Sequence, residues 1–85
     1  QVHGGAVSGM MDTAMGMSIM AKSGRPVTTA ELNVSFIRPF LGESFLIDTE
    51  ILYMGRNLIR TRSTAYDEES GKLLASATAN FAYVG

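Results

Sequence analysis

The sequence predicts an α+β fold in which an antiparallel sheet wraps around one long central helix. Residues 4–21 are small or apolar almost throughout and contain five of the six methionines, whereas four later segments alternate apolar and polar residues. The first pattern is typical of a buried helix and the second of half-buried strands. A helix followed by strands that short turns connect indicates an α+β layer arrangement.

Size and composition limit the classes of protein to which the chain can belong. At 85 residues there is room for one small domain, residues 1–85, and a partner chain is expected to stabilise it. A net charge of −1 argues against nucleic-acid binding, which uses a clustered basic excess. With no cysteine and one histidine, we expect no disulfide, metal site or other cofactor. No signal peptide is evident, so a cytoplasmic location is expected.

The helix expected over residues 4–21 has recognisable ends. Gly4 and Gly5 suit a tight entry, and the segment 22–24 supplies a cation and a glycine for the exit. A membrane span over the same residues would place Asp12 at its centre, which costs roughly 2.5–3.5 kcal/mol. We therefore expect the helix to be buried by protein, and no membrane partner.

Four strands are expected after the helix, at residues 28–36, 44–54, 58–67 and 72–84. Strict alternation places these side chains of the first strand on one face: Ala30, Leu32, Val34 and Phe36, with Thr29, Glu31, Asn33 and Ser35 opposite. The apolar face of the second strand would hold Phe45, Ile47, Ile51 and Tyr53. That of the last strand would hold Leu73, Ala75, Ala77, Ala79, Phe81 and Tyr83.

Turn residues separate these strands and set their order. Arg38-Pro39 ends the first strand because proline lacks an amide donor. Gly55-Arg56-Asn57 predicts a tight hairpin, and the polar segment 67–72 predicts another turn. The last three strands should therefore form an antiparallel meander. The alanines of the last strand leave space on the sheet for a methionine-rich helix.

Asp12 is the one charge inside the apolar segment. A soluble protein seldom buries an ion without a partner or a task, so Asp12 is either a functional carboxylate or a structural one with a hydrogen-bonded partner. A helix N-terminus offers free N–H groups and partial positive charge, and glycine there permits close approach. Asp12 lies eight residues beyond Gly4, about 12 Å along one helix, so one carbonyl group could not touch both.

Three segments carry a resemblance to a known family. They are "HGGAVSGMMDTAMG", "VTTAELNVSFIRPFLGE" and "YMGRNLIRTRSTAYDEESGKLLASATANF". Together they resemble a hotdog-fold acyl-CoA thioesterase of the phenylacetate-degradation type, in the 4-hydroxybenzoyl-CoA thioesterase-like superfamily. The resemblance covers nearly the whole chain. The family normally has an N-terminal strand, and an Asn shortly before His-Gly-Gly, which these residues do not include, so an N-terminally truncated domain is expected.

The resemblance implies an activity and an assembly. The activity is hydrolysis of aromatic or medium-chain acyl-CoA, and the assembly is a homodimer, with two dimers stacked into a tetramer as a further option. In similar enzymes the helix start of one subunit, here Gly4, polarises the carbonyl, while the carboxylate of the other, here Asp12, attacks it or activates water. Thr29 matches a hydroxyl position that can hold this water. His3 would act as a base or hydrogen-bond at the helix entry.

The same resemblance suggests where substrate binds. Gly5 and Met11 are expected beside the acyl group. CoA phosphates need cations or free amides, and Arg38 and Arg56 are the first candidates, with Arg60 and Arg62 behind them. The residues named for catalysis and for binding also have ordinary structural interpretations. Gly4 and Gly5 would be turn residues, Met11 a core side chain and Thr29 a strand threonine, and the arginines would be solvated side chains.

Two other functions remain open. A hotdog enoyl-CoA hydratase or dehydratase would pair a histidine with a carboxylate, and His3 with Asp12 is the available pair, although the Pro-rich segment usual around that histidine is absent. A hotdog protein that binds acyl-CoA without turnover, or that only dimerises, is the non-enzymatic alternative.

Overall fold

A computed structural model describes residues 4–40 and 44–84 of the chain. Its elements are α1 (Gly4–Ser23), β1 (Val27–Phe36), β2 (Phe45–Met54), β3 (Leu58–Asp67) and β4 (Leu73–Tyr83). Every predicted helix and strand is present, with bounds within two residues of those predicted. Across these two ranges, no helix has both the length and the apolar character that a bilayer crossing requires.

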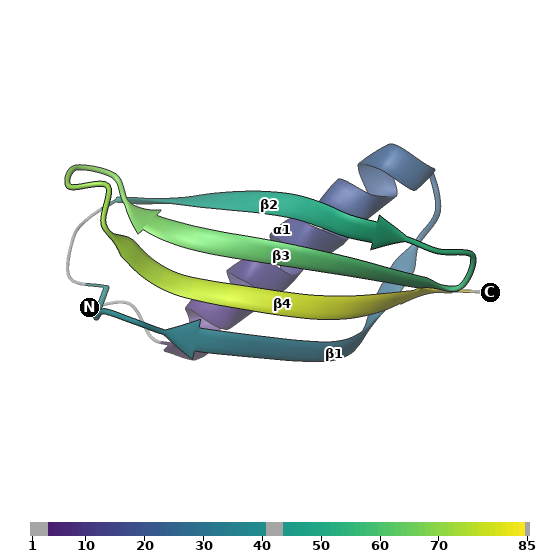
Figure 1. Cartoon of the computed structure of the whole chain (residues 1–85), viewed down its shortest axis with the longest axis horizontal. Coiled ribbons are helices and arrows are strands. Elements are labelled where there is room, and N and C mark those ends of the chain that lie inside the picture. The colour runs from purple at the N-terminus through teal and green to yellow at the C-terminus, as the bar shows by residue number, and fades with distance from the viewer. Residues whose placement is uncertain (1–3, 41–43, 85) are drawn as a thin grey trace.

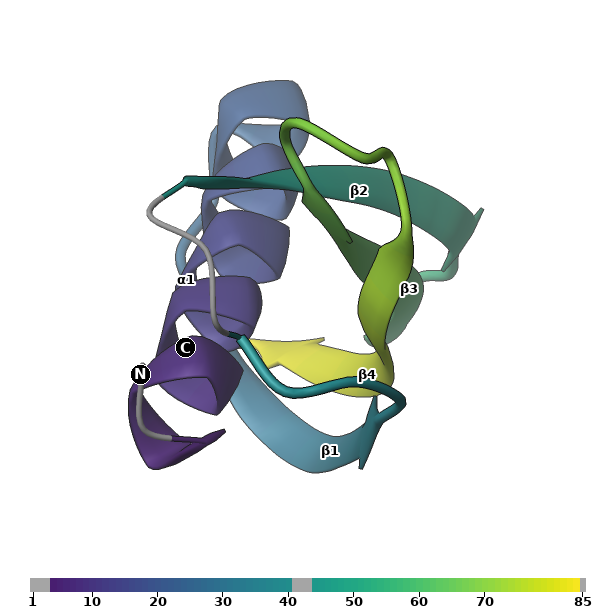
Figure 2. The ribbon, with the colours of Figure 1, turned by 90° about the vertical axis from the view of Figure 1, so that its left-hand side faces the viewer.

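The four strands form one antiparallel sheet in the order β1-β4-β3-β2. Consecutive pairing of β2, β3 and β4 confirms the predicted meander, and β1 pairs with β4 to form one edge of the sheet (Figure 1). The helix α1 crosses one face of the sheet diagonally, and the sheet curves around it (Figure 2). The predicted α+β layer arrangement is therefore confirmed.

The core lies between α1 and the inner face of the sheet. One row of helix side chains, spaced four residues apart, is fully buried: Val7, Met11, Met15 and Ile19. The small side chains of β4 that face them are at most 2% exposed: Ala75, Ala77 and Ala79. The opposite helix face is open and carries Met10, Met17 and Met20, between 40% and 60% exposed. The helix is thus buried on one side, because a single sheet covers it.

Three β-bulges change which strand residues face the helix. Each inserts one unopposed residue: Ala30 in β1, Leu52 in β2 and Leu74 in β4. Successive strand side chains point to opposite faces, so an extra residue moves those beyond it to the other face. The alternation that the sequence predicts therefore fails at these three points.

The bulges correct three predicted positions. Thr29 pairs with buried Phe81 and so lies on the helix face, not opposite it. Tyr53 pairs with Arg60 on the outer face, where strict alternation had placed it inward. In β4, Leu74 enters the core and is 6% exposed, while Leu73 pairs with Tyr66 on the outer face. Directly paired residues share a face in an antiparallel sheet, which fixes each assignment.

The predicted turns have the backbone geometry that their residues favour. Gly24 ends α1 with a φ of 71°, and its N–H donates to the carbonyl of Met20 over 2.8 Å. Gly71 adopts a φ of 73° in the β3–β4 turn. Both angles lie in the left-handed region, where glycine has no Cβ penalty. In the β2–β3 hairpin the N–H of Gly55 donates to the carbonyl of Leu58 over 2.9 Å.

Candidate active site

The side chains of Asp12 and Thr29 meet on the flank of the core. Asp12 lies near the middle of α1 and is half-buried, and its Oδ1 accepts a 2.7 Å hydrogen bond from the hydroxyl of Thr29. A helix residue points about 100° away from its predecessor, so Asp12 is turned aside from Met11, which points into the core. The bulge at Ala30 places Thr29 on the same face as Leu32 and therefore toward α1.

The start of α1 is the second part of the predicted site. The helix is continuous from Gly4 to Ser23, so its first residue and Asp12 are separated by eight residues and about 12 Å. A Cβ added at Gly5 or at Gly9 would meet nothing within 4 Å, so the side of the helix between its start and Asp12 is open. His3 lies outside the described residues.

The predicted substrate-binding residues are dispersed. Met11 is fully buried in the core of the chain. Arg38 is exposed, and its Nη1 donates to the carbonyl of Leu73 over 2.8 Å, so it ties the end of β1 to the start of β4. Arg56 is exposed in the β2–β3 turn. Gly5 is exposed in the first turn of α1.

The end of β1, which Arg38 follows, and the β2–β3 turn, which contains Arg56, lie at opposite ends of the sheet (Figure 1). Arg38 follows the strand end at which Phe36 pairs with Ala75, and Arg56 precedes the strand start at which Leu58 pairs with Ala82. These two positions are seven residues apart on β4, or about 23 Å at 3.3 Å per residue. One phosphate group cannot contact both arginines of the same chain.

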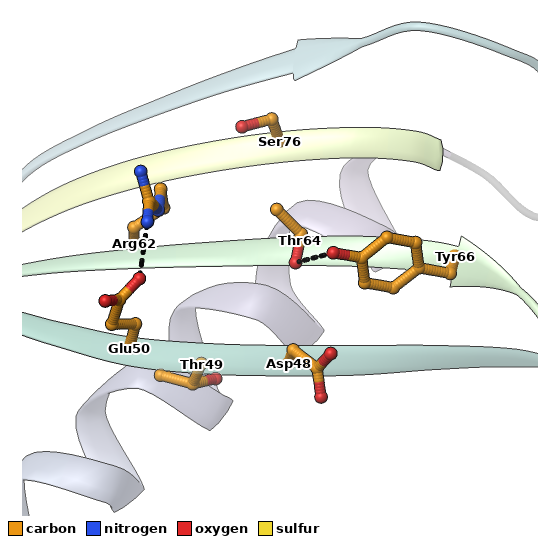
Figure 3. A pocket seen from close by; sticks show the side chains of 7 residues that line it. All are labelled: Asp48, Thr49, Glu50, Arg62, Thr64, Tyr66 and Ser76. Carbon is orange, nitrogen blue, oxygen red and sulfur yellow. Dashed lines mark hydrogen bonds and ion pairs between the residues drawn. The ribbon is translucent and has the colours of Figure 1, made fainter. Parts of the chain in front are cut away.

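A polar pocket of about 450 Å³ lies on the outer face of the sheet (Figure 3). It is lined by Asp48, Thr49, Glu50, Arg62, Thr64, Tyr66 and Ser76. Arg62 is ion-paired with Glu50, and the hydroxyls of Thr64 and Tyr66 are 3.1 Å apart in a hydrogen bond. Neither Asp12 nor Thr29 belongs to this pocket, which the strand alternation did not single out.

Throughout residues 4–40 and 44–84, no three acidic, histidine or cysteine side chains are grouped to hold a metal ion.

Comparison with known proteins identifies the family. A sequence model of the thioesterase superfamily matches residues 1–74. The chain belongs to the thioesterase superfamily. A search of curated proteins gave no match.

Solved structures of other proteins have the same fold. The BH2602 protein from Bacillus halodurans, solved with CoA, is 28% identical with a TM-score of 0.90 over 98% of this chain and 56% of its own. Thioesterase superfamily member 2 from Mus musculus is 25% identical with a TM-score of 0.87, over 99% and 66%. A protein from Ralstonia eutropha, described as a thioesterase and as related to phenylacetic acid degradation, is 31% identical with a TM-score of 0.87, over 99% and 63%.

These likenesses confirm the hotdog fold that the sequence motifs predicted for this thioesterase-superfamily chain. The helix α1, with the sheet wrapped around it, corresponds to the matched part of each structure. The chain spans 56–66% of the length of these three proteins.

Proposed function

We propose that the chain is an acyl-CoA thioesterase that acts in the cytoplasm on aromatic or medium-chain acyl-CoA. The observation that carries the proposal is the Asp12 carboxylate, held by the Thr29 hydroxyl over 2.7 Å beside an open stretch of α1. Membership of the thioesterase superfamily and the likeness to a protein solved with CoA support this substrate class.

The reaction uses two groups that one chain holds about 12 Å apart. In the proposed homodimer, the Gly4 N–H of one subunit donates to the thioester carbonyl oxygen. Asp12 of the partner subunit takes a proton from water, and the resulting hydroxide attacks the carbonyl carbon. The helix start stabilises the oxyanion that forms. The carbon–sulfur bond then breaks, and the sulfur leaves as the thiol with the proton that Asp12 carried.

Asp12 has a second route to the same products. Its carboxylate attacks the carbonyl carbon directly, the thiolate leaves, and water hydrolyses the anhydride that remains. Thr29 serves both routes, because its hydrogen bond to Oδ1 fixes the carboxylate plane. His3 is a further candidate base at the helix entry.

An edge strand supports the proposed dimer. Among the described strands, β1 and β2 each have a neighbour on one side alone, and an open edge is a template for pairing with another chain. Pairing of β1 with its own copy across a two-fold axis would bring the Asp12–Thr29 pair to the subunit boundary. Stacking of two such dimers into a tetramer is compatible with this arrangement.

The surroundings of Asp12 favour an uncharged acyl group. Gly9, the helical neighbour of Asp12 at i−3, leaves room beside the carboxylate, because a Cβ there would meet nothing within 4 Å, whereas Gly16 at i+4 lies against the ring of Phe81. Met10 and Met17 lie on the same helix, and their side chains are exposed. Apolar pockets discriminate weakly, by roughly 1–3 kcal/mol per methylene, so we expect broad acyl selectivity.

The proposal is tested by following free thiol during incubation with phenylacetyl-CoA, hexanoyl-CoA and succinyl-CoA. We expect thiol release, with a higher kcat/KM for the first two substrates than for succinyl-CoA. With an unsaturated thioester, crotonyl-CoA, added as a fourth substrate, hydration of its double bond without thiol release would identify a hydratase instead. Saturable binding without turnover would identify a binding protein, and both outcomes contradict the proposal.

A further inference from the structure

The Asp12–Thr29 hydrogen bond has a second contact beside it, about one helical turn further along α1. Gly16 follows Asp12 by four residues, so both lie on the same side of the helix. A Cβ built on Gly16 would lie 3.4 Å from Cε2 and 3.9 Å from Cζ of Phe81, at the far edge of the ring. Phe81 is the residue of β4 that pairs with Thr29 of β1. Two neighbours on the helix therefore face two paired neighbours on the sheet.

The spacing along the helix matches the spacing across the sheet at this point. Four residues advance an α-helix by about 6 Å, and adjacent strands lie about 4.8 Å apart. Because α1 crosses the sheet diagonally, this advance carries it from β1, at Asp12, to β4, at Gly16 (Figure 1). The residue before Gly16, Met15, accepts a 3.1 Å hydrogen bond at its Sδ from the hydroxyl of Thr61 on β3. The helix thus contacts three neighbouring strands over five residues.

Phe81 is a large side chain on a strand whose inner face is otherwise small under the helix. Ala75, Ala77 and Ala79 precede it on the same face, and Phe81 is 2% exposed. Large buried side chains of α1 face these alanines, whereas a glycine faces the ring, so the two surfaces interlock. A Cβ on Gly16 would already be in van der Waals contact with the ring, so a longer side chain there would displace the ring or the helix.

We infer that Gly16 and Phe81 are positioning residues for Asp12. Their contact fixes the separation of α1 from the sheet beside the carboxylate, and thereby holds Asp12 Oδ1 2.7 Å from the Thr29 hydroxyl. Thr29 is exposed on an edge strand, so the strand itself does little to hold the helix at that point. Misplacement of a catalytic group by about 1 Å can lower a rate about a hundredfold. The inference rests on the proposed function for its effect on turnover, since both residues act through Asp12.

A larger residue at position 16 should disturb the site without breaking the helix. Valine is no worse than glycine in a helix, and Gly16→Val adds two methyl groups beyond a Cβ that already contacts the Phe81 ring. We expect kcat for phenylacetyl-CoA to fall about tenfold, with KM changed less than about twofold. In a Thr29→Val background, Gly16→Val should lower kcat by less than about twofold more, because the hydrogen bond is already lost. Adding Phe81→Leu to Gly16→Val shortens the ring and should restore kcat to within about threefold of the unaltered chain.

Leu74→Ala is the matched control, because Leu74 is also buried on β4 but lies at the opposite end of the strand. It should lower the free energy of unfolding and leave kcat unchanged. Equal falls in kcat in Leu74→Ala and Gly16→Val would overturn the inference, since loss of stability alone would explain both. If circular dichroism shows that Gly16→Val does not fold, Phe81→Leu takes its place in each comparison. Its kcat should fall, and an equal fall in the Thr29→Val background would overturn the inference.

A spectroscopic measurement separates this inference from the proposed function. The carboxyl carbon-13 resonance of Asp12 is identified by its absence from the spectrum of Asp12→Asn. Thr29→Val should move this resonance, and Gly16→Val should move it in the same direction, whereas Leu74→Ala should leave it in place. If no thioester is hydrolysed, the proposed function fails while this comparison still tests the positioning of Asp12. A resonance that Gly16→Val leaves in place would overturn the inference.

Discussion

Thr29 donates a 2.7 Å hydrogen bond to Oδ1 of Asp12 and so links edge strand β1 to the middle of α1. The contact lies on the flank of a largely apolar interface between helix and sheet, in which Thr61 and Ser63 are also buried. Because the hydroxyl engages Oδ1, we assign Oδ2 to the water or to the thioester. The site therefore depends on β1, the strand that would pair with its own copy in the proposed dimer. Substitution of Asp12 or of Thr29 should change the geometry of the site.

Asp12→Asn preserves the shape of the side chain and removes its basicity. If Asp12 is the base or the nucleophile, kcat should fall by about 10²–10⁴-fold, the usual range for loss of a positioned base. KM should change little. The measurement is steady-state thiol release from phenylacetyl-CoA, with circular dichroism to establish folding. Full turnover in the variant would refute the catalytic role, and an unfolded variant would indicate a structural carboxylate.

Thr29→Val removes the hydroxyl at nearly constant volume. A hydrogen bond to a charged group contributes roughly 1.5–3 kcal/mol, so losing the correct orientation of Asp12 should lower kcat by about tenfold or more. Thr29→Ser retains the donor and should keep most of the activity. Equal losses in Thr29→Val and Thr29→Ser would show that the methyl group, not the hydrogen bond, matters.

Leu73 and Leu74 provide a test of the bulge in β4. Leu74 is 6% exposed and belongs to the core, whereas Leu73 is half-buried on the outer face. Leu74→Ala should lower the free energy of unfolding by about 2–4 kcal/mol, as for a buried leucine. Leu73→Ala should cost less than about half of that. Urea titration measures both, and the reverse order would contradict the register.

The three bulges also mark where sequence reasoning reached its limit. Helix and strand bounds follow from apolar periodicity and from glycine turns, and the structure confirms them. The face of each side chain depends on an unbroken register, however, and Ala30, Leu52 and Leu74 have no sequence feature that distinguishes a bulge residue. Thr29 was therefore identified as a site residue by family motif, while alternation placed it on the wrong face. The pocket at Tyr66 was missed because it joins residues from three strands.

The carboxylate of Asp67 should make stability depend on acidic pH. Its Oδ2 accepts hydrogen bonds from the backbone N–H and the hydroxyl of Ser70, both 2.8 Å, and the first of these is the main cause of its lowered pKa. The unfolded chain, with an ordinary pKa near 3.8, then binds a proton before the folded chain does. Stability from this group is present above that value and is lost as pH falls through the lower folded pKa.

Asp67→Asn isolates this effect from the other acidic groups. Urea midpoints of both proteins, measured at about pH 6 and about pH 3, should converge as pH falls, because the unaltered chain alone loses the Asp67 contribution. A difference between the two urea midpoints that is the same at both pH values would show that the Asp67 carboxylate has the same pKa in the folded and the unfolded chain.

A mixture of two inactive variants would test whether the site is shared between subunits. Gly4→Pro removes the N–H assigned to the carbonyl oxygen, and proline is tolerated in the first turn of a helix. Asp12→Asn removes the base. A heterodimer of these two chains contains one site with an intact helix start from one subunit and an intact Asp12 from the other. Its second site lacks both groups.

Unfolding the two variants together and refolding them should therefore restore activity. Random pairing of equal amounts makes half of the dimers heterodimers, each with one functional site, so about a quarter of the activity of the unaltered chain is expected. Variants mixed without unfolding should remain inactive until subunits exchange. Mass spectrometry of differently tagged chains verifies that heterodimers form. If they form and thiol release does not recover, Gly4 and Asp12 do not act across the subunit boundary.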